Sequence, residues 1–490
     1  MIMADSGSIQ AEMRTGGLIC VNESPLKDSN ALLLPLVAFC IIAQYSADGL
    51  LYGQHRGFVG LELAFSFLLM VVFPVSRLAG SRDMLEPFNI VICLYAVFYL
   101  VKVIDILVNG AFRNETNTSD LMISKALFLA NIGIVCFCFG YSLPSANSNP
   151  RIPRLLSHWR RTDTIVVSFI LILFGMSRFA GIIYGILAGS FDLSRRGLLL
   201  RGMGFTLIAS FMYPIGIVML YLLTVAKRRK KKHCVAAALF AVVMLIPFLA
   251  LGSRGDFFVF VMAIVLLYNY FVRRIRLRHA IFLCVLLFLC SAGFLRFRGT
   301  GTVRNIFSPA DRQLSCRGLL HESMMSFGGT EGFIRVLDSQ IPKTYGSEYI
   351  SVLTIYVPKA IWPNKPKLGI GIYFTNYFYP GVYRTGTTYG PSLLGAFYMN
   401  FGYWGIVTGM FALGLVLKKA YLVFKANRDN MSLALIYSIL MPVVCFKAVS
   451  QSCSDMIAFI PAILFSIVPA MLAMSFMAGA VPTGGRRADE

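Results

Sequence analysis

Hydrophobic residues stand in long blocks along this chain, and short polar segments separate the blocks. Most blocks have about the 17–25 residues that an α-helix needs to cross the hydrocarbon core of a bilayer. Because backbone within that core must satisfy its own hydrogen bonds, the blocks predict membrane-spanning helices. The pattern therefore predicts an all-α polytopic membrane protein with about twelve transmembrane helices. The predicted spans are 31–47, 58–76, 88–109, 121–142, 164–188, 205–226, 234–251, 255–272, 280–295, 391–416, 431–447 and 456–478.

One polar segment, 296–390, is far longer than the others and lies between the ninth and tenth predicted spans. Connections of this length are uncommon in compact domains and are usually functional. We therefore expect this loop to carry the functional site. The pattern divides the chain into a polar N-terminal segment 1–30, a membrane domain of helices one to nine over 31–295, the large loop 296–390, a membrane domain of helices ten to twelve over 391–478, and a tail 479–490.

The large loop has helical and aromatic patterns of its own. A serine-proline pair at 308–309 is typical of a helix start and predicts a helix that ends at Met325. A second helix is predicted over 330–338. Beyond it, Trp362 lies in a proline-rich turn, and seven aromatic residues follow between 373 and 389. Aromatic rings with a polar end suit sugar faces and equally suit the bilayer interface, so both interpretations stay open.

Composition and charge agree with a membrane protein. Hydrophobic residues make up 57% of the chain, and the mean hydropathy is +0.70. A net charge of +22 would also fit a nucleic-acid-binding protein, but many basic residues gather in short loops, which stay in the cytoplasm. Alternation from these loops predicts cytoplasmic termini and an external loop 296–390, and we expect no nucleic-acid partner. The orienting loops are 151–161, 227–232, 273–278 and 418–428.

Two segments on the predicted external face are rich in basic residues, and the short one opposes the rule that short basic loops stay in the cytoplasm, a rule that does not bind long loops. The short loop 189–204 has three arginines against one acid, and the loop 296–390 has eleven basic side chains against five acidic ones. Arg is suited to bidentate phosphate recognition, so these loops predict a cationic cleft for a diphosphate-linked substrate. Binding of lipid headgroups is the alternative. The predicted binding residues are Arg195, Arg196, Arg201, Arg296, Arg298, Arg304, Arg317, Trp362, Lys365, Tyr377 and Arg384.

Transfer from a glycosyl diphosphate needs positive charge on the departing diphosphate and often a base on the attacking hydroxyl. Arg can supply that charge in place of a divalent cation, and the early external loops have no paired acids, so we expect no metal and no cofactor. His321 is the first candidate base, because imidazole accepts a proton near neutral pH and Arg317 shares its helix face. A solvent-facing histidine is the alternative interpretation. Glu331 and Glu348 are the other candidates.

Two opposite charges, Lys102 and Asp105, lie within the third predicted span. Side chains three residues apart share one helix face and can pair. Charged residues inside a span are costly and often functional, but an ion pair near a helix end neutralises itself. We expect such a self-neutralised pair.

The order of these features, together with two stretches of sequence, resembles the Wzy-type O-antigen and exopolysaccharide repeat-unit polymerases. The stretches are YGSEYISVLTIYVPKAIWPNKP over 345–366 and GAFYMNFG over 395–402. The resemblance implies a GT-C-like membrane fold with a large helical periplasmic loop, in the bacterial inner membrane. It implies metal-independent polymerisation of undecaprenyl-diphosphate-linked oligosaccharides, with a flippase and a chain-length regulator as partners. It also implies that arginines of the third and fifth external loops, here 189–204 and 296–390, hold the substrates.

Two other classes of protein stay open. An O-antigen ligase has a similar fold, cationic external loops and an external histidine, whereas the tryptophan-proline-lysine stretch favours the polymerase. A lipid-linked oligosaccharide flippase or another transporter would show inverted repeats and interrupted helices in matching halves, and the chain shows no such symmetry.

Overall fold

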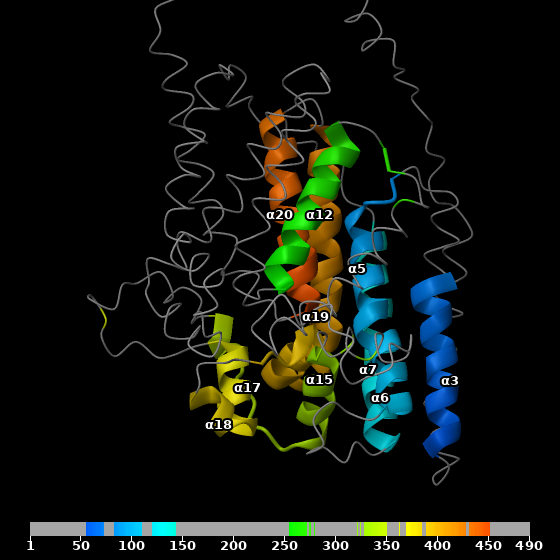
Figure 1. Ribbon diagram of the computed structural model, residues 1–490, viewed down its shortest axis with the longest axis vertical. Coiled ribbons are helices and arrows are strands. Elements are labelled where there is room, and N and C mark those ends of the chain that lie inside the picture. The colour runs from blue at the N-terminus through cyan, green and yellow to red at the C-terminus, as the bar shows by residue number, and fades with distance from the viewer. Residues whose placement is uncertain are drawn as a thin grey trace, which may run out of the picture. The chain divides into compact units, whose positions relative to one another are not determined.

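A computed structural model describes the chain in separate ranges, and all regular secondary structure in these ranges is helical (Figure 1). The all-α prediction is therefore confirmed for the described residues. These residues are 55–72, 83–109, 120–143, 254–271, 328–349, 369–384, 389–427 and 431–450, with the single positions 274, 275, 279, 321, 324 and 362.

The two helices over 370–384 are not predicted from the sequence, whereas the other described helices lie where the sequence predicts helices. Two of them continue into π-helices, which are η1 (Leu68–Val72) after α3 and η2 (Ala96–Val101) between α5 and α6. The α-helices are α3 (His55–Phe67), α5 (Pro87–Tyr95), α6 (Lys102–Asn109), α7 (Asp120–Ser142), α12 (Arg254–Phe271), α15 (Gly329–Asp338), α17 (Ile370–Phe378), α18 (Pro380–Arg384), α19 (Ser392–Ala426) and α20 (Met431–Ser450).

Three helical stretches of the described chain are long and apolar enough to cross a membrane: Pro87–Val108, Asp120–Ser142 and Ser392–Ala426. They coincide with the predicted spans 88–109, 121–142 and 391–416. Shorter apolar helices match three more predictions. The number twelve and the GT-C-like arrangement stay predictions, because the other six predicted spans lie outside the described residues. Those six are 31–47, 164–188, 205–226, 234–251, 280–295 and 456–478.

Among the described helices, α7 and α19 pack closely against each other through small residues. A Cβ added to Gly140 of α7 would overlap the backbone carbonyl oxygen of Phe411, and one added to Gly414 of α19 would overlap that of Phe137. Small residues allow such approach between membrane helices, where packing rather than exclusion of water drives association. The loop helix α15 packs against both helices of this pair.

Hydrogen bonds join helix ends that the charge pattern assigns to one face. Asp83, before α5, accepts hydrogen bonds from the hydroxyls of Tyr270 (3.1 Å) and Tyr421 (2.8 Å), at the ends of α12 and α19. Glu86 accepts one from Tyr141, at the end of α7 (2.7 Å). The contacts agree with the predicted alternation of chain direction. Which face is cytoplasmic stays a prediction.

The helix predicted over 391–416 differs from that expectation in two ways. It continues to Ala426, and it is broken at Phe401–Gly402, where Gly402 has φ 64° and ψ −143°. Residues with a Cβ rarely adopt this conformation, so glycine permits the break. The break falls within the GAFYMNFG stretch, and the first part of α19 is the part that the loop contacts.

Candidate functional site

The loop helix α15 is held against the membrane helices by its first turn. The prediction of a helix over 330–338 is confirmed, with the start at Gly329. The hydroxyl of Thr330 donates to the carbonyl oxygen of Phe98, in η2. A Cβ at Gly332 would come within 2.9 Å of the carbonyl oxygen of Gly390, so α15 lies tight against the start of α19. π-helical turns within α-helices are frequent at functional sites.

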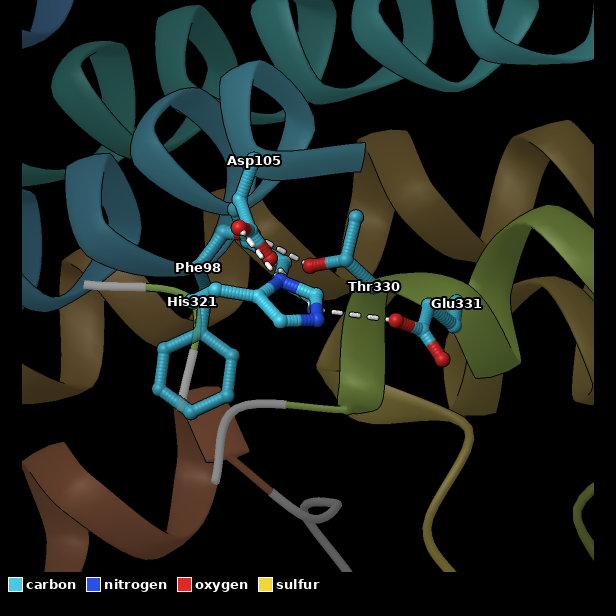
Figure 2. Close-up of polar contacts among 6 residues, drawn as sticks. Phe98, Asp105, His321, Thr330 and Glu331 are labelled. Atoms are coloured by element: carbon cyan, nitrogen blue, oxygen red, sulfur yellow. Dashed lines mark hydrogen bonds and ion pairs between the residues drawn. The ribbon is translucent and has the colours of Figure 1, made fainter. Parts of the chain in front are cut away.

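This docking brings four titratable side chains together from three segments of the chain (Figure 2). Lys102 Nζ lies 3.1 Å from Asp105 Oδ2 and 2.9 Å from Glu331 Oε1. His321 Nδ1 lies 2.8 Å from Asp105 Oδ1. We call Lys102, Asp105, His321 and Glu331 the charge cluster.

The charge cluster changes the interpretation of Lys102 and Asp105. Their predicted ion pair is present, but it is not self-contained, because the loop supplies a second carboxylate to Lys102 and an imidazole to Asp105. Both side chains are fully buried. Charged groups removed from water require partners, and here the partners come from the loop. The charges of this predicted span therefore belong to a cluster that includes loop residues.

His321 is the member of the cluster with the greatest access to solvent. Its side chain is 24% exposed, against 11% for Glu331 and 0% for Asp105. A carboxylate only accepts, so Nδ1 is the ring nitrogen that donates to Asp105, and Nε2 is the nitrogen that can accept a proton when the ring is neutral. Figure 2 shows the imidazole between Asp105 and the first turn of α15. The pair has the form of a general base with an orienting carboxylate.

Lys102 has a different role from the predicted binding cations. Its ammonium lies between two carboxylates, and its side chain has no exposed surface. It cannot reach a diphosphate in this arrangement. Its positive charge instead compensates Asp105 and Glu331, which allows a buried carboxylate to orient the histidine.

Glu348, another candidate base, belongs to a separate set of contacts. It is buried, and its Oε1 accepts a hydrogen bond of 2.7 Å from the side-chain amide of Asn400. The amide oxygen of Asn400 accepts from the hydroxyl of Thr344 (2.8 Å) and from the backbone N–H of Gly346 (2.9 Å). These contacts fix the segment after α15 to the break in α19. They favour a structural role for Glu348.

The aromatic part of the loop forms α17 and α18 and packs around an arginine that the sequence interpretation did not select. Arg335 of α15 donates to the hydroxyl of Tyr379 (2.9 Å), and its guanidinium lies 4.6 Å from the centre of that ring. Tyr377, a predicted binding residue, is exposed and contacts Tyr373 and Phe378. Trp362 is also exposed. Exposed rings of this kind suit sugar faces.

Most predicted cationic binding residues lie outside the described part of the chain, so their assignment stays a prediction. Arg384 ends α18, but its side chain is also outside that part. The residues with no described position are Arg195, Arg196, Arg201, Arg296, Arg298, Arg304, Arg317 and Lys365.

Comparisons of the chain with models of protein families, with curated proteins and with solved structures find no match.

Proposed function

We propose that this protein is a metal-independent membrane glycosyltransferase of the bacterial inner membrane. It polymerises undecaprenyl-diphosphate-linked oligosaccharide repeat units on the periplasmic face, by moving the growing glycan onto the next lipid-linked unit. We propose a flippase that delivers the units and a chain-length regulator as its partners.

The observation that carries the proposal is the contact of 2.8 Å between His321 Nδ1 and buried Asp105 Oδ1, with the imidazole still open to solvent. General acid–base catalysis needs a group that is oriented, accessible and able to change protonation near neutral pH. The site lies at a loop helix seated on apolar helices, where an amphipathic lipid-linked substrate would meet the protein.

In the proposed reaction, Nε2 of His321 takes the proton of a sugar hydroxyl on the incoming unit. The hydroxyl oxygen attacks the anomeric carbon of the growing glycan. The bond from that carbon to the diphosphate oxygen breaks, and the electron pair leaves with the lipid diphosphate. Asp105 stabilises the imidazolium that forms, and the released proton goes to solvent.

The departing diphosphate needs positive charge from other residues, because Lys102 is enclosed by the cluster. We propose that the arginines of 189–204 and of 296–390 supply it, with exposed Tyr377 and Trp362 against the sugars. Turnover is then expected in excess chelator, because guanidinium groups take the place of a divalent cation.

Surface glycan in a deletion strain tests the proposal. The polymerase predicts a glycan that carries one repeat unit. An unattached glycan would indicate a ligase, and absence of export would indicate a flippase, so either result would overturn the proposal. Complementation with wild type or with His279→Ala should restore long chains, whereas His321→Ala at equal protein level should not. His279 is the matched control, because it is exposed and lies in a loop predicted to be cytoplasmic.

A further inference from the structure

Two lysines from distant parts of the chain converge on a pair of tyrosines at the break in α19. Lys343, in the segment after α15, has its Nζ 3.6 Å from the centre of the Tyr398 ring, and Lys125 of α7 has its Nζ 5.9 Å from that of Tyr403. The two rings meet edge to face, with 5.3 Å between their centres. We call these four residues the lysine–tyrosine site.

The positive charges of this site are not balanced by the described protein. Among the described residues, neither lysine forms an ion pair with a carboxylate. Glu348, the acid of the same segment, gives its Oε1 to Asn400. Burial lowers the pKa of Lys343, and the charge of Lys125 lowers it further. Like charges held together without a counter-charge favour an anion between them.

Exposed aromatic side chains surround the lysine–tyrosine site, as is typical of a bilayer interface. Trp404, beside Tyr403, is 76% exposed, and Phe401, Tyr403 and Tyr345 are also exposed. Aromatic side chains gather at the depth of the lipid headgroups. The second part of α19 starts at this point, after Gly402, and the start of a helix favours negative charge.

We propose that the lysine–tyrosine site binds the headgroup phosphate of a lipid with net negative charge at the membrane interface. One lysine contributes from the loop and one from the bundle, so the bound phosphate ties the loop to α7. The ammonium of Lys343 donates one hydrogen bond to the carbonyl oxygen of Tyr398 (3.0 Å), and its remaining N–H groups are the donors for the phosphate. The inference does not depend on the proposed glycan transfer.

Fluorescence of Trp404 tests this site in the full chain. Trp159→Phe and Trp362→Phe leave Trp404 as the one tryptophan of the three in the sequence. The protein is reconstituted in phosphatidylcholine vesicles that contain an equal small fraction of either brominated phosphatidylglycerol or brominated phosphatidylcholine. We expect stronger quenching by brominated phosphatidylglycerol, because its headgroup has a net negative charge, whereas the choline cation neutralises the phosphate of phosphatidylcholine. The preference should fall by roughly fivefold for each lysine replaced by alanine.

Three variants and one competitor make the result decisive. Lys125→Arg with Lys343→Arg should keep the preference, and Lys419→Ala, exposed near the other end of α19, should not change it. Equal quenching by both lipids in the wild type, or a preference that survives Lys125→Ala with Lys343→Ala, would overturn the proposal. Full displacement by inorganic pyrophosphate at a concentration equal to that of the lipid would assign the site to a soluble anion and overturn it as well.

Discussion

Lys102 is the buried lysine of the charge cluster, and its position depends on compensation by neighbouring carboxylates. It is fully buried and contacts two carboxylates, 3.1 Å and 2.9 Å away. A cation in such a place is kept because its removal leaves uncompensated negative charge in a medium that solvates it poorly. Its contribution is therefore expected to be to stability, and through Asp105 to the orientation of His321.

Replacement of Lys102 by Met should lower the free energy of unfolding by about 3–5 kcal/mol, because both carboxylates lose their shared partner. The melting temperature of the detergent-purified protein measures this. Lys419→Met, on an exposed part of α19, is the control and should melt like the wild type. If Lys102→Met melts at the wild-type temperature, the ammonium is not compensating the two acids.

At the residue scale, sequence reasoning found part of the site. His321 and Glu331 were selected because external titratable groups are few, and the structure brings both into the charge cluster. Asp105 was interpreted only as the partner of Lys102. The spacing of three residues predicts that local contact, but Asp105 and His321 are 216 residues apart in sequence. The signal for a wider role was a carboxylate within an apolar span.

At the element scale, the contact between α7 and α19 depends on glycine. Gly140→Ala would force a methyl group against the carbonyl oxygen of Phe411, which belongs to helix backbone and has little freedom to move. We expect this change to lower folded yield and melting temperature. Gly60→Ala in α3 is the matched control, because a Cβ there meets nothing within 4 Å and alanine favours helix by about 1 kcal/mol. Equal behaviour of the two variants would contradict this packing.

Asn400 joins α19 to the loop segment after α15, and its side-chain amide donates two hydrogen bonds and accepts two. Its amide nitrogen donates to Glu348 Oε1 and to the carbonyl oxygen of Ala396, and its oxygen accepts from Thr344 and Gly346. Asn400→Asp would place a carboxylate against Glu348, so we expect lower stability at neutral pH. Addition of Glu348→Gln should restore part of the loss, because the new amide can donate to the aspartate. Thermal unfolding of the three variants measures this, and a double variant no more stable than Asn400→Asp would refute the contact.

The elements themselves were largely predictable, whereas their breaks and contacts were not. Length and continuous apolar character predicted 88–109 and 121–142 to within a few residues of the structure. The break at Phe401–Gly402 was missed because a single glycine within an apolar run is also compatible with a continuous helix. Its physical signature is a backbone angle, which sequence alone does not show. The contact between α15 and η2 joins residues that are far apart in the sequence. The local pattern of apolar and polar residues therefore does not predict it.

At the scale of the whole molecule, the charge pattern and the contacts agree on the alternation of helices but leave their absolute orientation to experiment. The basic loops predict that position 230 is cytoplasmic and that position 364 is external. Single cysteines at Lys230 and Asn364, in a background without the eleven native cysteines, should differ in labelling by an impermeant reagent in intact spheroplasts. Labelling of 364 but not 230 is expected. The opposite pattern would place the charge cluster on the cytoplasmic side. It would therefore contradict the proposal of a reaction on the periplasmic face.

The central claim is that His321, oriented by Asp105, moves the proton during glycan transfer. The most direct test incubates purified protein with lipid-linked repeat units from the deletion strain and measures product length by gel and mass spectrometry over time. Wild type and His279→Ala should produce a ladder of multiples of the repeat unit. His321→Ala should be slower by roughly 10²–10⁴-fold, and Asp105→Asn should lower kcat with little change in KM. A ladder formed by His321→Ala at the wild-type rate would contradict the account.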